Sequence, residues 1–448
     1  MKREDLLSKI SDPSKVWDVV VIGGGATGLG VAVDAVTRGY SVALFEWEDF
    51  AKATSSRSTK LVHGGVRYLA QGDVSLVLEA LYERGLLQQN APHLVKNQSF
   101  LIPNYRYWDN FLYTVGLTIY DILAGRLSLG RSKYVSKKKT TSYLPTVRVD
   151  GLKGGVVYHD GQFDDSRLAV NLAQSCVENG GCPINRMKVT AILHGSDGRA
   201  RGVKVQDLMN GQEYEVKAKA VINATGIFVD SIMEMDVPTH EHMVKPSQGV
   251  HLVLDKSFLQ SDYAIMIPKT DDGRVLFAVP WHDKVVVGTT DTLREHPELE
   301  PQALESEIEF ILNTAGRYLT RKPQRSDVLS VFAGLRPLAA PKKEGKSTKE
   351  ISRSHKIFVS ENKLITITGG KWTTYRRMAE DTVDKAIELN LLEKKACVTK
   401  KFRIHGYQLN PDLNNHLYIY GSDIQAIKTL MQSDPAMAEK LHPKYDYT

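Results

Sequence analysis

One polar run between residues 55 and 69 holds more groups suited to ligand chemistry than any other part of the chain. It reads Ser-Ser-Arg-Ser-Thr-Lys-Leu-Val-His-Gly-Gly-Val-Arg-Tyr-Leu. Its hydroxyl groups can cap the next helix or bond phosphate and ribose oxygens, and Gly64-Gly65 would let a flat ring approach the backbone. His63 and Arg67 add a titratable group and a cation. Because binding residues concentrate on loops, we interpret the run as a ligand-binding loop rather than a serine-rich surface segment.

A glycine cluster near the N-terminus has the spacing of a dinucleotide-binding turn. Gly23, Gly25 and Gly28 follow an apolar run over residues 19–22 and fit the pattern G-x-G-x-x-G. Such glycines permit a tight turn, close approach of a pyrophosphate and close packing of helix on strand. A helix is expected over residues 26–38 and a strand over 42–45, and Glu46 follows where an acidic side chain accepts from a ribose hydroxyl. A carboxylate there would repel a 2′-phosphate, so the sequence predicts FAD or NAD.

A second cluster, Gly369-Gly370-Lys371, follows the alternating stretch over residues 364–368. Both clusters are typical of a strand that leads through a glycine turn into a helix, where backbone N–H groups and the positive helix end face an anion. A further glycine turn at Gly226 follows a strand expected over residues 217–222. We interpret the two clusters as contacts to the two ends of one bound flavin.

Composition narrows the class of protein. At 448 residues, the chain is long enough for two or three domains, and 42% hydrophobic with 25% charged residues is ordinary for a globular protein. The net charge of +6 suits anionic substrates or an anionic membrane surface but is too weak to indicate nucleic acid. Cys176, Cys182 and Cys397 have no metal-binding spacing and leave one cysteine over, so we expect a reducing compartment and no metal. Neither a signal peptide nor a membrane-spanning helix is expected, since Asp121 and Arg126 interrupt the most apolar stretch.

The predicted cofactor contacts are scattered, which indicates a discontinuous nucleotide-binding domain over residues 1–90, 155–245 and 332–390. It contains a helix expected over 162–176 and a strand hairpin over 200–222 with its turn at Asn210-Gly211. Residues 91–154 and 246–331 would form a substrate or cap domain, with one large antiparallel sheet from strands near 251–254, 264–267, 275–279 and 284–287. Residues 391–448 are expected to form a mostly helical C-terminal domain, and the natural protein is expected to be longer.

Four motifs in this order carry a resemblance to a known family: the first glycine cluster, the run over residues 55–69, Gly334-Leu335-Arg336-Pro337-Leu338, and the stretch Gly-Gly-Lys-Trp-Thr-Thr-Tyr-Arg over residues 369–376. From about residue 16 to residue 386 the chain resembles the FAD-dependent (aerobic) glycerol-3-phosphate dehydrogenases, within the amino-acid-oxidase-like flavoproteins. The resemblance implies an α/β fold: a Rossmann-like FAD-binding domain of glutathione-reductase or amino-acid-oxidase type, an antiparallel-sheet α+β substrate domain and a C-terminal helical domain.

The resemblance implies that the chain oxidises sn-glycerol 3-phosphate to dihydroxyacetone phosphate and passes electrons from FAD to a membrane quinone. A phosphomonoester dianion requires several cations, and charge-assisted contacts are worth roughly 1.5–3 kcal/mol each. The matching positions for the substrate are Arg67, Tyr68, Arg336, Arg353 and Lys371. The matching positions for the cofactor are Gly23, Gly25, Gly28, Glu46, Ser55, Ser56, Ser58, His63, Gly64, Gly65, Val189, Gly226, Gly370, Lys371 and Thr373.

The expected reaction transfers a hydride from C2 of the substrate to N5 of the flavin. His251 is the first candidate for the base that takes the C2 hydroxyl proton, and His63 is the rival. Arg336 would polarise the developing oxygen charge, and Lys371 would favour the anionic reduced ring. Two departures from the family pattern are Ile227-Phe228 in place of Pro-Trp, and Gln248 where a basic residue is common.

Membrane contact is expected from an aromatic stretch followed by basic residues, because aromatics can enter a lipid interface and bases attract anionic headgroups. These residues are Tyr105, Tyr107, Trp108, Phe111, Leu112, Tyr113, Arg131, Lys133, Lys137, Lys138 and Lys139. The same stretch could pack inside the substrate domain. With the resemblance, it predicts a cytoplasmic protein, peripheral on the inner face of the membrane; a homodimer is allowed.

Three other functions stay open at this point. A glycerol-3-phosphate oxidase would use oxygen, and the choice of acceptor depends on access to the reduced flavin. An amino-acid or amine oxidase of the same flavoprotein class would need fewer cations than the four at the matching positions, which are Arg67, Arg336, Arg353 and Lys371. A non-catalytic flavin-binding protein is disfavoured because no member of the catalytic set is missing.

Overall fold

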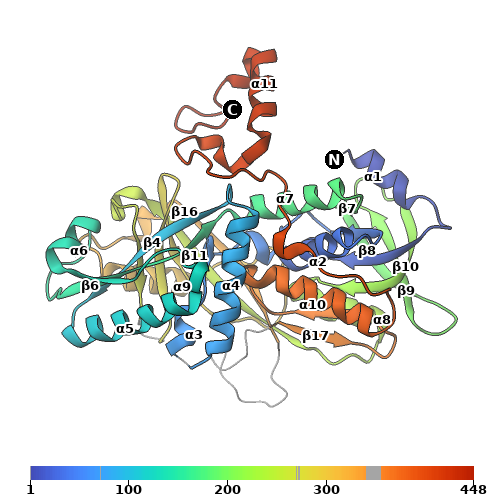
Figure 1. The fold of residues 1–448 in the computed structure, drawn as a ribbon, viewed down its shortest axis with the longest axis horizontal. Coiled ribbons are helices and arrows are strands. Elements are labelled where there is room, and N and C mark those ends of the chain that lie inside the picture. Colours follow the sequence, from blue (N-terminus) through green and yellow to red (C-terminus); the bar gives the residue numbers. More distant parts are fainter. Residues whose placement is uncertain (1, 71, 269, 271–272, 340–354) are drawn as a thin grey trace.

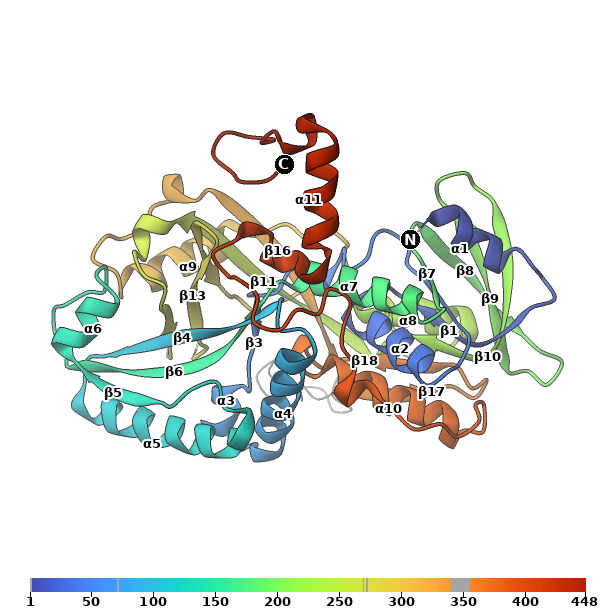
Figure 2. The same cartoon turned by 45° about the horizontal axis from the view of Figure 1, so that its top comes forward.

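The computed structural model describes residues 2–448 except 71, 269, 271–272 and 340–354, and leaves the side chains of Arg67 and Ala70 undescribed. Two β-sheets lie side by side, each with helices packed on its faces, and a C-terminal segment projects from the body (Figure 1). Arg353 lies outside the described residues. Each sheet and its helices form one half of the molecule. Figure 2 shows α4 (Val74–Asn90) of one half close to α10 (Tyr375–Glu388) of the other.

The first sheet has a parallel core that is apolar on both faces. Its strands follow the order β17-β18-β10-β1-β2-β7, and β8 and β9 extend it beside β10. In the central strand, Val19 and Val21 enter one hydrophobic core while Val20 and Ile22 enter the other, as expected where both faces are covered. The strands are β1 (Val16–Ile22), β2 (Val42–Phe45), β7 (Cys182–Ile184), β8 (Met187–His194), β9 (Ala200–Asp207), β10 (Glu213–Asn223), β17 (Lys356–Val359) and β18 (Ile365–Thr368).

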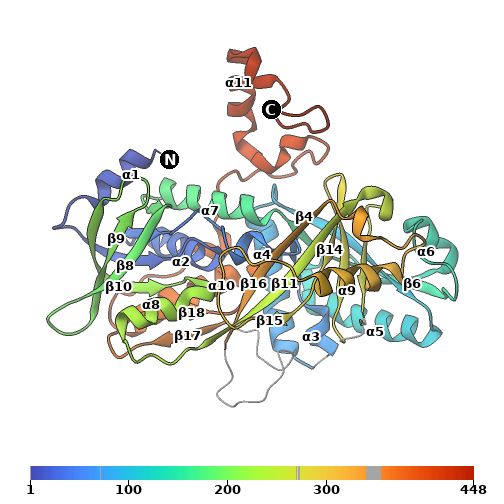
Figure 3. The ribbon, with the colours of Figure 1, turned by 180° about the vertical axis from the view of Figure 1, so that it is seen from behind.

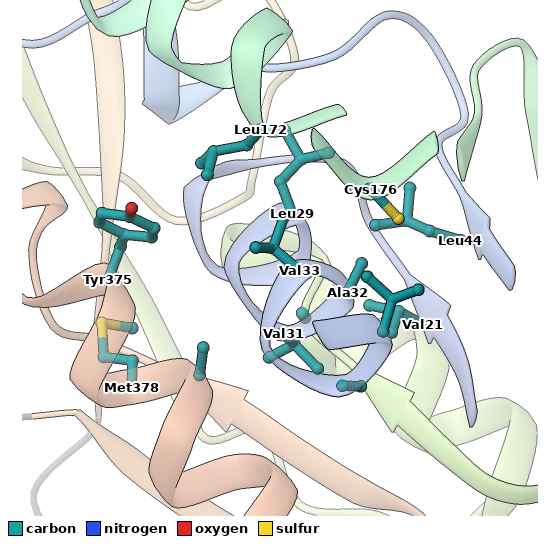
Figure 4. Close-up of a cluster of buried hydrophobic side chains, with 14 of the residues drawn as sticks. Val21, Leu29, Val31, Ala32, Val33, Leu44, Leu172, Cys176, Tyr375 and Met378 are labelled. Atoms are coloured by element: carbon teal, nitrogen blue, oxygen red, sulfur yellow. The ribbon is translucent and has the colours of Figure 1, made fainter. Parts of the chain in front are cut away.

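Three helices cover one face of this sheet. In Figure 4, α2 (Ala26–Thr37) lies between α7 (Asp165–Glu178) and α10, with Leu29 near Leu172 of α7 and with Tyr375 and Met378 on α10. Cys176 belongs to this core, and burial raises the pKa of its thiol to about 12, which suits a packing residue. The other face is covered by α1 (Arg3–Ile10), by α8 (Val229–Asp236) and by the β8–β9 hairpin.

The second sheet is mixed. Its order is β15-β11-β14-β13-β12-β4-β6-β3, with β16 beside β11 and β5 beside β6. The predicted antiparallel sheet is confirmed for the strands β11, β14, β13 and β12, and the pair β4–β12, which joins them to the rest of the sheet, is parallel. The strands are β3 (Leu61–Val62), β4 (Val95–Asn104), β5 (Lys133–Ser136), β6 (Gly154–Phe163), β11 (Val244–Asp255), β12 (Ala264–Ile267), β13 (Leu276–Trp281), β14 (Lys284–Gly288), β15 (Thr292–Leu293) and β16 (Ser330–Ala339).

Helices also cover both faces of the second sheet. On one face, α9 (Glu305–Gly316) inserts Ile308, Ile311 and Leu312 between strand side chains. On the other, α5 (Tyr107–Ala124) contributes Leu117. The remaining helices of this half are α3 (Val66–Ala70) and α6 (Lys137–Tyr143).

A buried ion pair joins the two halves. Arg376 of α10 donates to Glu83 of α4 from Nη2 at 2.6 Å and from Nε at 2.8 Å, and to Glu380 on its own helix at 2.9 Å. Removing one member of such a pair leaves a buried charge without its partner, so the contact fixes how α4 and α10 meet.

The predicted hairpin is confirmed as β9 and β10. The predicted helix over residues 162–176 begins later, at Asp165, because β6 runs through Phe163 and Asp164 then caps the helix by accepting from the Arg167 backbone N–H. The C-terminal segment contains α11 (Ile424–Ser433), which projects from the body (Figure 3), and short 3₁₀ turns; Ile404, before α11, packs in the core of the first sheet. Among the described residues, no helix is long and apolar enough to cross a membrane.

Candidate active site

A cavity of about 570 Å³ lies at the carboxyl ends of the parallel strands, where ligands bind in open α/β sheets. Its wall comes mainly from stretches of consecutive residues near 22–27, 45–55, 187–189, 224–235 and 369–372. The two glycine clusters, which are more than three hundred residues apart in the sequence, therefore meet at one cavity.

The first glycine turn is built so that only glycine fits at two of its positions. Gly23 has φ +103°, and a Cβ there would lie 2.7 Å from the Ala224 carbonyl oxygen. A Cβ on Gly28 would lie 1.9 Å from the Gly23 carbonyl oxygen, so this glycine allows α2 to pack onto its own turn. The N-terminus of α2 is thereby brought to the cavity, and its backbone N–H groups can bind a pyrophosphate.

Ser55 connects the two glycine clusters. Its Oγ accepts a hydrogen bond from the Ala26 backbone N–H at 2.9 Å, at the start of α2. Its carbonyl oxygen accepts from the Trp372 indole N–H at 2.7 Å, next to the second cluster. The hydroxyl run was expected to cap the helix that follows it, whereas Ser55 bonds to the start of α2, a helix that precedes it in the chain.

Glu46 lines the cavity but also braces the glycine turn. One carboxylate oxygen accepts from the Gly24 backbone N–H at 2.6 Å and the other from the Glu48 N–H at 2.8 Å. Burial raises the pKa of this carboxyl group. A carboxylate has about four acceptor positions, so the predicted ribose contact can coexist with these two bonds.

Eight of the predicted cofactor residues line this cavity: Gly23, Gly25, Glu46, Ser55, Val189, Gly226, Gly370 and Lys371. The others lie beside it. Ser58 donates to Asp165 at 2.6 Å, and the Ser56 hydroxyl faces the Ala53 carbonyl at 3.5 Å. The Thr373 hydroxyl accepts from the His63 backbone N–H, and the Gly64 N–H bonds to the Tyr120 hydroxyl. Phe228, one of the two departures from the family pattern, lines the cavity and packs edge-on against Trp47.

A second cavity, of about 190 Å³, adjoins the first on the side of the second sheet. Its lining residues come from many elements, and the predicted residues His63, Gly65, Tyr68 and Arg336 are among them. The two cavities meet at Lys371, which lines the first cavity and places its Nζ 3.9 Å from the centre of the Tyr68 ring in the second.

Arg336 is held by a polar stretch that directly follows β14. Its Nη1 donates to the Thr290 carbonyl at 3.1 Å and its Nη2 donates to the Thr289 hydroxyl at 3.0 Å, while Asp291 lies 3.7 Å away. Gly249 leaves room for the guanidinium group, since a Cβ there would lie 2.3 Å from Nη2. A second cation, Arg274, donates to the Asp291 carbonyl at 2.9 Å and also lines this cavity.

His251 lies behind the wall of this cavity. Its ring is 2% exposed, stacks on Phe332 and is 2.8 Å from the Thr59 hydroxyl through Nε2. Burial, with Arg336 and Lys60 nearby, lowers the pKa of His251 to about 3. Thr59 lines the cavity and His251 does not, so the first candidate base would reach a ligand through Thr59, whereas His63 faces it directly.

Sequence reasoning missed Arg274, Thr289, Thr290 and Asp291. Thr289, Thr290 and Asp291 could have been found from the sequence, because they directly follow an apolar strand and binding residues concentrate on such loops. Arg274 had none, because only the pairing of β13 with β14 brings it to Asp291. Asp160 was also missed; it lies under the cavity and bonds to Arg84 and to Tyr120, each at 2.7 Å.

Comparison with known proteins agrees with this geometry. Residues 18–376 match the FAD dependent oxidoreductase family. The mitochondrial glycerol-3-phosphate dehydrogenase of Saccharomyces cerevisiae is 40% identical over 447 residues, which cover 91% of this chain and 69% of the yeast protein. The mitochondrial enzyme of Arabidopsis thaliana is 45% identical over 409 residues, which cover 88% of this chain and 64% of that protein. The chain thus spans about two thirds of the length of these curated relatives.

Solved structures give the same result. The glycerol-3-phosphate dehydrogenase of Bacillus halodurans, complexed with FAD, superposes with a TM-score of 0.78 at 31% identity, covering 98% of this chain and 82% of that one. The FAD-bound L-alpha-glycerophosphate oxidase of Mycoplasma pneumoniae, at 18% identity, has a TM-score of 0.66, covers 88% of this chain and 99% of that one, and shares the fold. The predictions of fold class and of FAD are confirmed, and the chain belongs to the FAD-dependent oxidoreductase family, among the relatives of glycerol-3-phosphate dehydrogenase.

Proposed function

We propose that this protein oxidises sn-glycerol 3-phosphate to dihydroxyacetone phosphate with FAD bound in the larger cavity. The observation that carries the proposal is the smaller cavity, where Arg274 and Arg336 face a space directly adjoining the cofactor cavity. Two guanidinium groups suit a phosphate dianion or a developing oxyanion, because each forms strong charge-assisted hydrogen bonds. Lys371 adds a cation at the junction. Arg67 and Arg353 stay predicted contributors.

The residues that line the larger cavity would hold FAD, which would supply the hydride acceptor for oxidation at C2 of the substrate. The protein's own task is to remove the hydroxyl proton and to stabilise the oxygen from which it leaves. His63 can take the proton directly, and His251 can take it through the Thr59 hydroxyl. Arg336, held in place by Thr289 and Thr290, would stabilise the developing charge on the oxygen.

The test is an anaerobic titration of the FAD-loaded protein with glycerol 3-phosphate, glycerol and sarcosine, followed by flavin absorbance. Bleaching by glycerol 3-phosphate alone is expected. Bleaching by sarcosine instead would assign the chain to amine oxidation and contradict the role given to the arginines.

A membrane quinone is the proposed acceptor, and α5 supports this. Its outward side chains include Tyr107, Trp108 and Ile122, which are 72%, 68% and 71% exposed, and Phe111 at 59%. The basic residues predicted to face headgroups, Arg131, Lys133, Lys137, Lys138 and Lys139, are exposed. Tyr105 and Tyr113 are half-buried instead, and burial raises the pKa of each to about 12, so these two contribute to the core. The curated relatives named above are mitochondrial.

Flotation with anionic vesicles tests this surface. Wild type is expected to float, and Trp108→Ser with Phe111→Ser to float less; absence of flotation at low and high salt would contradict the membrane proposal. Reoxidation of the reduced flavin by a soluble quinone should be faster than by oxygen, and the reverse result would favour an oxidase.

A further inference from the structure

Glu307 is a buried carboxylate that no step of the proposed reaction uses. It lies on α9, is 5% exposed, and all of its hydrogen-bond partners among the described residues are neutral. One oxygen accepts from the hydroxyls of Thr290 at 2.9 Å and Thr292 at 2.7 Å. The other accepts from the Gln248 amide at 2.6 Å and the Leu304 backbone N–H at 3.0 Å. Four donors thus converge on one carboxylate in the interior.

Two of these donors belong to the segment that holds Arg336. Thr290 donates its hydroxyl proton to Glu307, accepts at that hydroxyl from the Val250 N–H at 3.0 Å, and accepts from Arg336 at its carbonyl. The neighbouring Thr289 hydroxyl accepts from the second guanidinium nitrogen. Both faces of this short segment are therefore fixed: Glu307 binds it from behind, and Arg336 binds it from the cavity side.

The Glu307 contacts join three parts of the chain: strand β11, residues 290–292 and the start of α9. Gln248 lies on β11, directly beside the strand that carries Arg336, with Leu335 as its register partner. In this chain, its neutral amide bonds to Glu307, so the carboxylate is not paired with a cation there. A buried charge is stable only where its hydrogen bonds are complete, and this requirement constrains the geometry of every donor.

We propose that Glu307 is a positioning residue that sets the orientation of the Arg336 guanidinium group by fixing residues 289–292. In Glu307→Gln, an amide NH₂ replaces one carboxylate oxygen and can only donate. The bonds to Thr290 and Thr292 then survive only if both hydroxyls reverse and accept from the amide, and the Thr290 hydroxyl already accepts from the Val250 N–H. We expect residues 289–292 to shift and Arg336 to lose the acceptors that orient it. The kinetic test rests on the proposed function, because it uses glycerol 3-phosphate as the substrate.

A double-mutant cycle measured on the FAD-loaded protein tests this role. Glu307→Gln should slow flavin bleaching by on the order of 10- to 100-fold, the scale expected for a misplaced catalytic group. In an Arg336→Ala background the same change should cost less than about 3-fold, because the group it positions is already gone. Glu309→Gln, on the exposed side of the same helix, should retain the wild-type rate. Equal losses from Glu307→Gln in both backgrounds would overturn the proposal.

A second variant and a crystal structure test the same role if the kinetic result with Glu307→Gln cannot be obtained. Thr292→Val removes one donor without changing charge, and it replaces Glu307→Gln in the cycle if that variant fails to fold or to retain FAD. A crystal structure of the FAD-loaded variant needs no substrate: the Arg336-to-Thr290 hydrogen bond should be lost, and its survival would overturn the proposal. If wild type is not bleached by glycerol 3-phosphate, the proposed function fails, and the crystal structure still decides the role of Glu307.

Discussion

The two cavities of this protein are built in different ways. The larger cavity, proposed to hold FAD, is lined mainly by stretches of consecutive residues that include the glycine turns. The smaller cavity is lined by short pieces of several strands and loops, and strand pairing brings side chains such as Arg274 and Arg336 together there. Substitution of a glycine in the turn should therefore abolish cofactor binding. Substitution of one side chain in the smaller cavity should slow the reaction and leave the cofactor bound.

The largest effect is expected at the turn. In Gly28→Ala, the new Cβ would lie 1.9 Å from the Gly23 carbonyl oxygen, so α2 must move away from the site of the pyrophosphate. We expect purification without flavin, measured by the absorbance of bound FAD, and no activity. Gly116→Ala is the matched control, since its Cβ meets nothing within 4 Å on α5. Full flavin content in Gly28→Ala would contradict the backbone-built site.

Arg336→Ala should show the opposite pattern. FAD content should match wild type, while flavin reduction by glycerol 3-phosphate falls by about 10²-fold or more, as for removal of an oxyanion donor. Rapid-mixing measurement of the reduction rate at saturating substrate separates this loss from weaker binding. A loss of flavin in this variant would show that the two cavities are not independent.

Thr59→Val separates the two candidate bases. It removes the hydroxyl between His251 and the cavity and leaves His63 untouched. If His251 is the base, reduction should slow by roughly the 10²-fold expected for loss of a general base, and His63→Asn should have a smaller effect. If His63 is the base, the order reverses. Near-wild-type reduction in Thr59→Val, His251→Asn and His63→Asn would exclude both.

The smallest effect concerns stability at acidic pH. The folded-state pKa of His251 is about 3, below the unfolded value of about 6.5, so between these values the unfolded chain binds one more proton. Stability therefore falls as the pH falls through this window, by up to about 1.4 kcal/mol per pH unit from this residue. His251→Asn should have a shallower acid-side slope in urea unfolding and the same slope above about pH 7. An unchanged acid-side slope would contradict a buried neutral imidazole.

The same difference between the cavities explains which site residues could be predicted from the sequence. Gly23, Glu46 and Ser55 were found because a strand, a turn and a helix lie within a short stretch, where local rules hold. Arg336 was found only by resemblance, and Arg274 not at all, because their neighbours are set by strand register. The burial of His251 likewise depends on Phe332 of the adjacent strand. The proposed domain boundaries and the roles of the site residues stay predictions.

The contact between Lys371 and Tyr68 is a place where a ligand in one cavity can influence the other cavity. The ammonium group belongs to the wall of one cavity and the ring to the wall of the other, 3.9 Å apart. A ligand that draws the ammonium group toward itself changes the surface offered to the second ligand. Reciprocity then requires that any factor by which FAD strengthens substrate binding is the same factor by which substrate retains FAD.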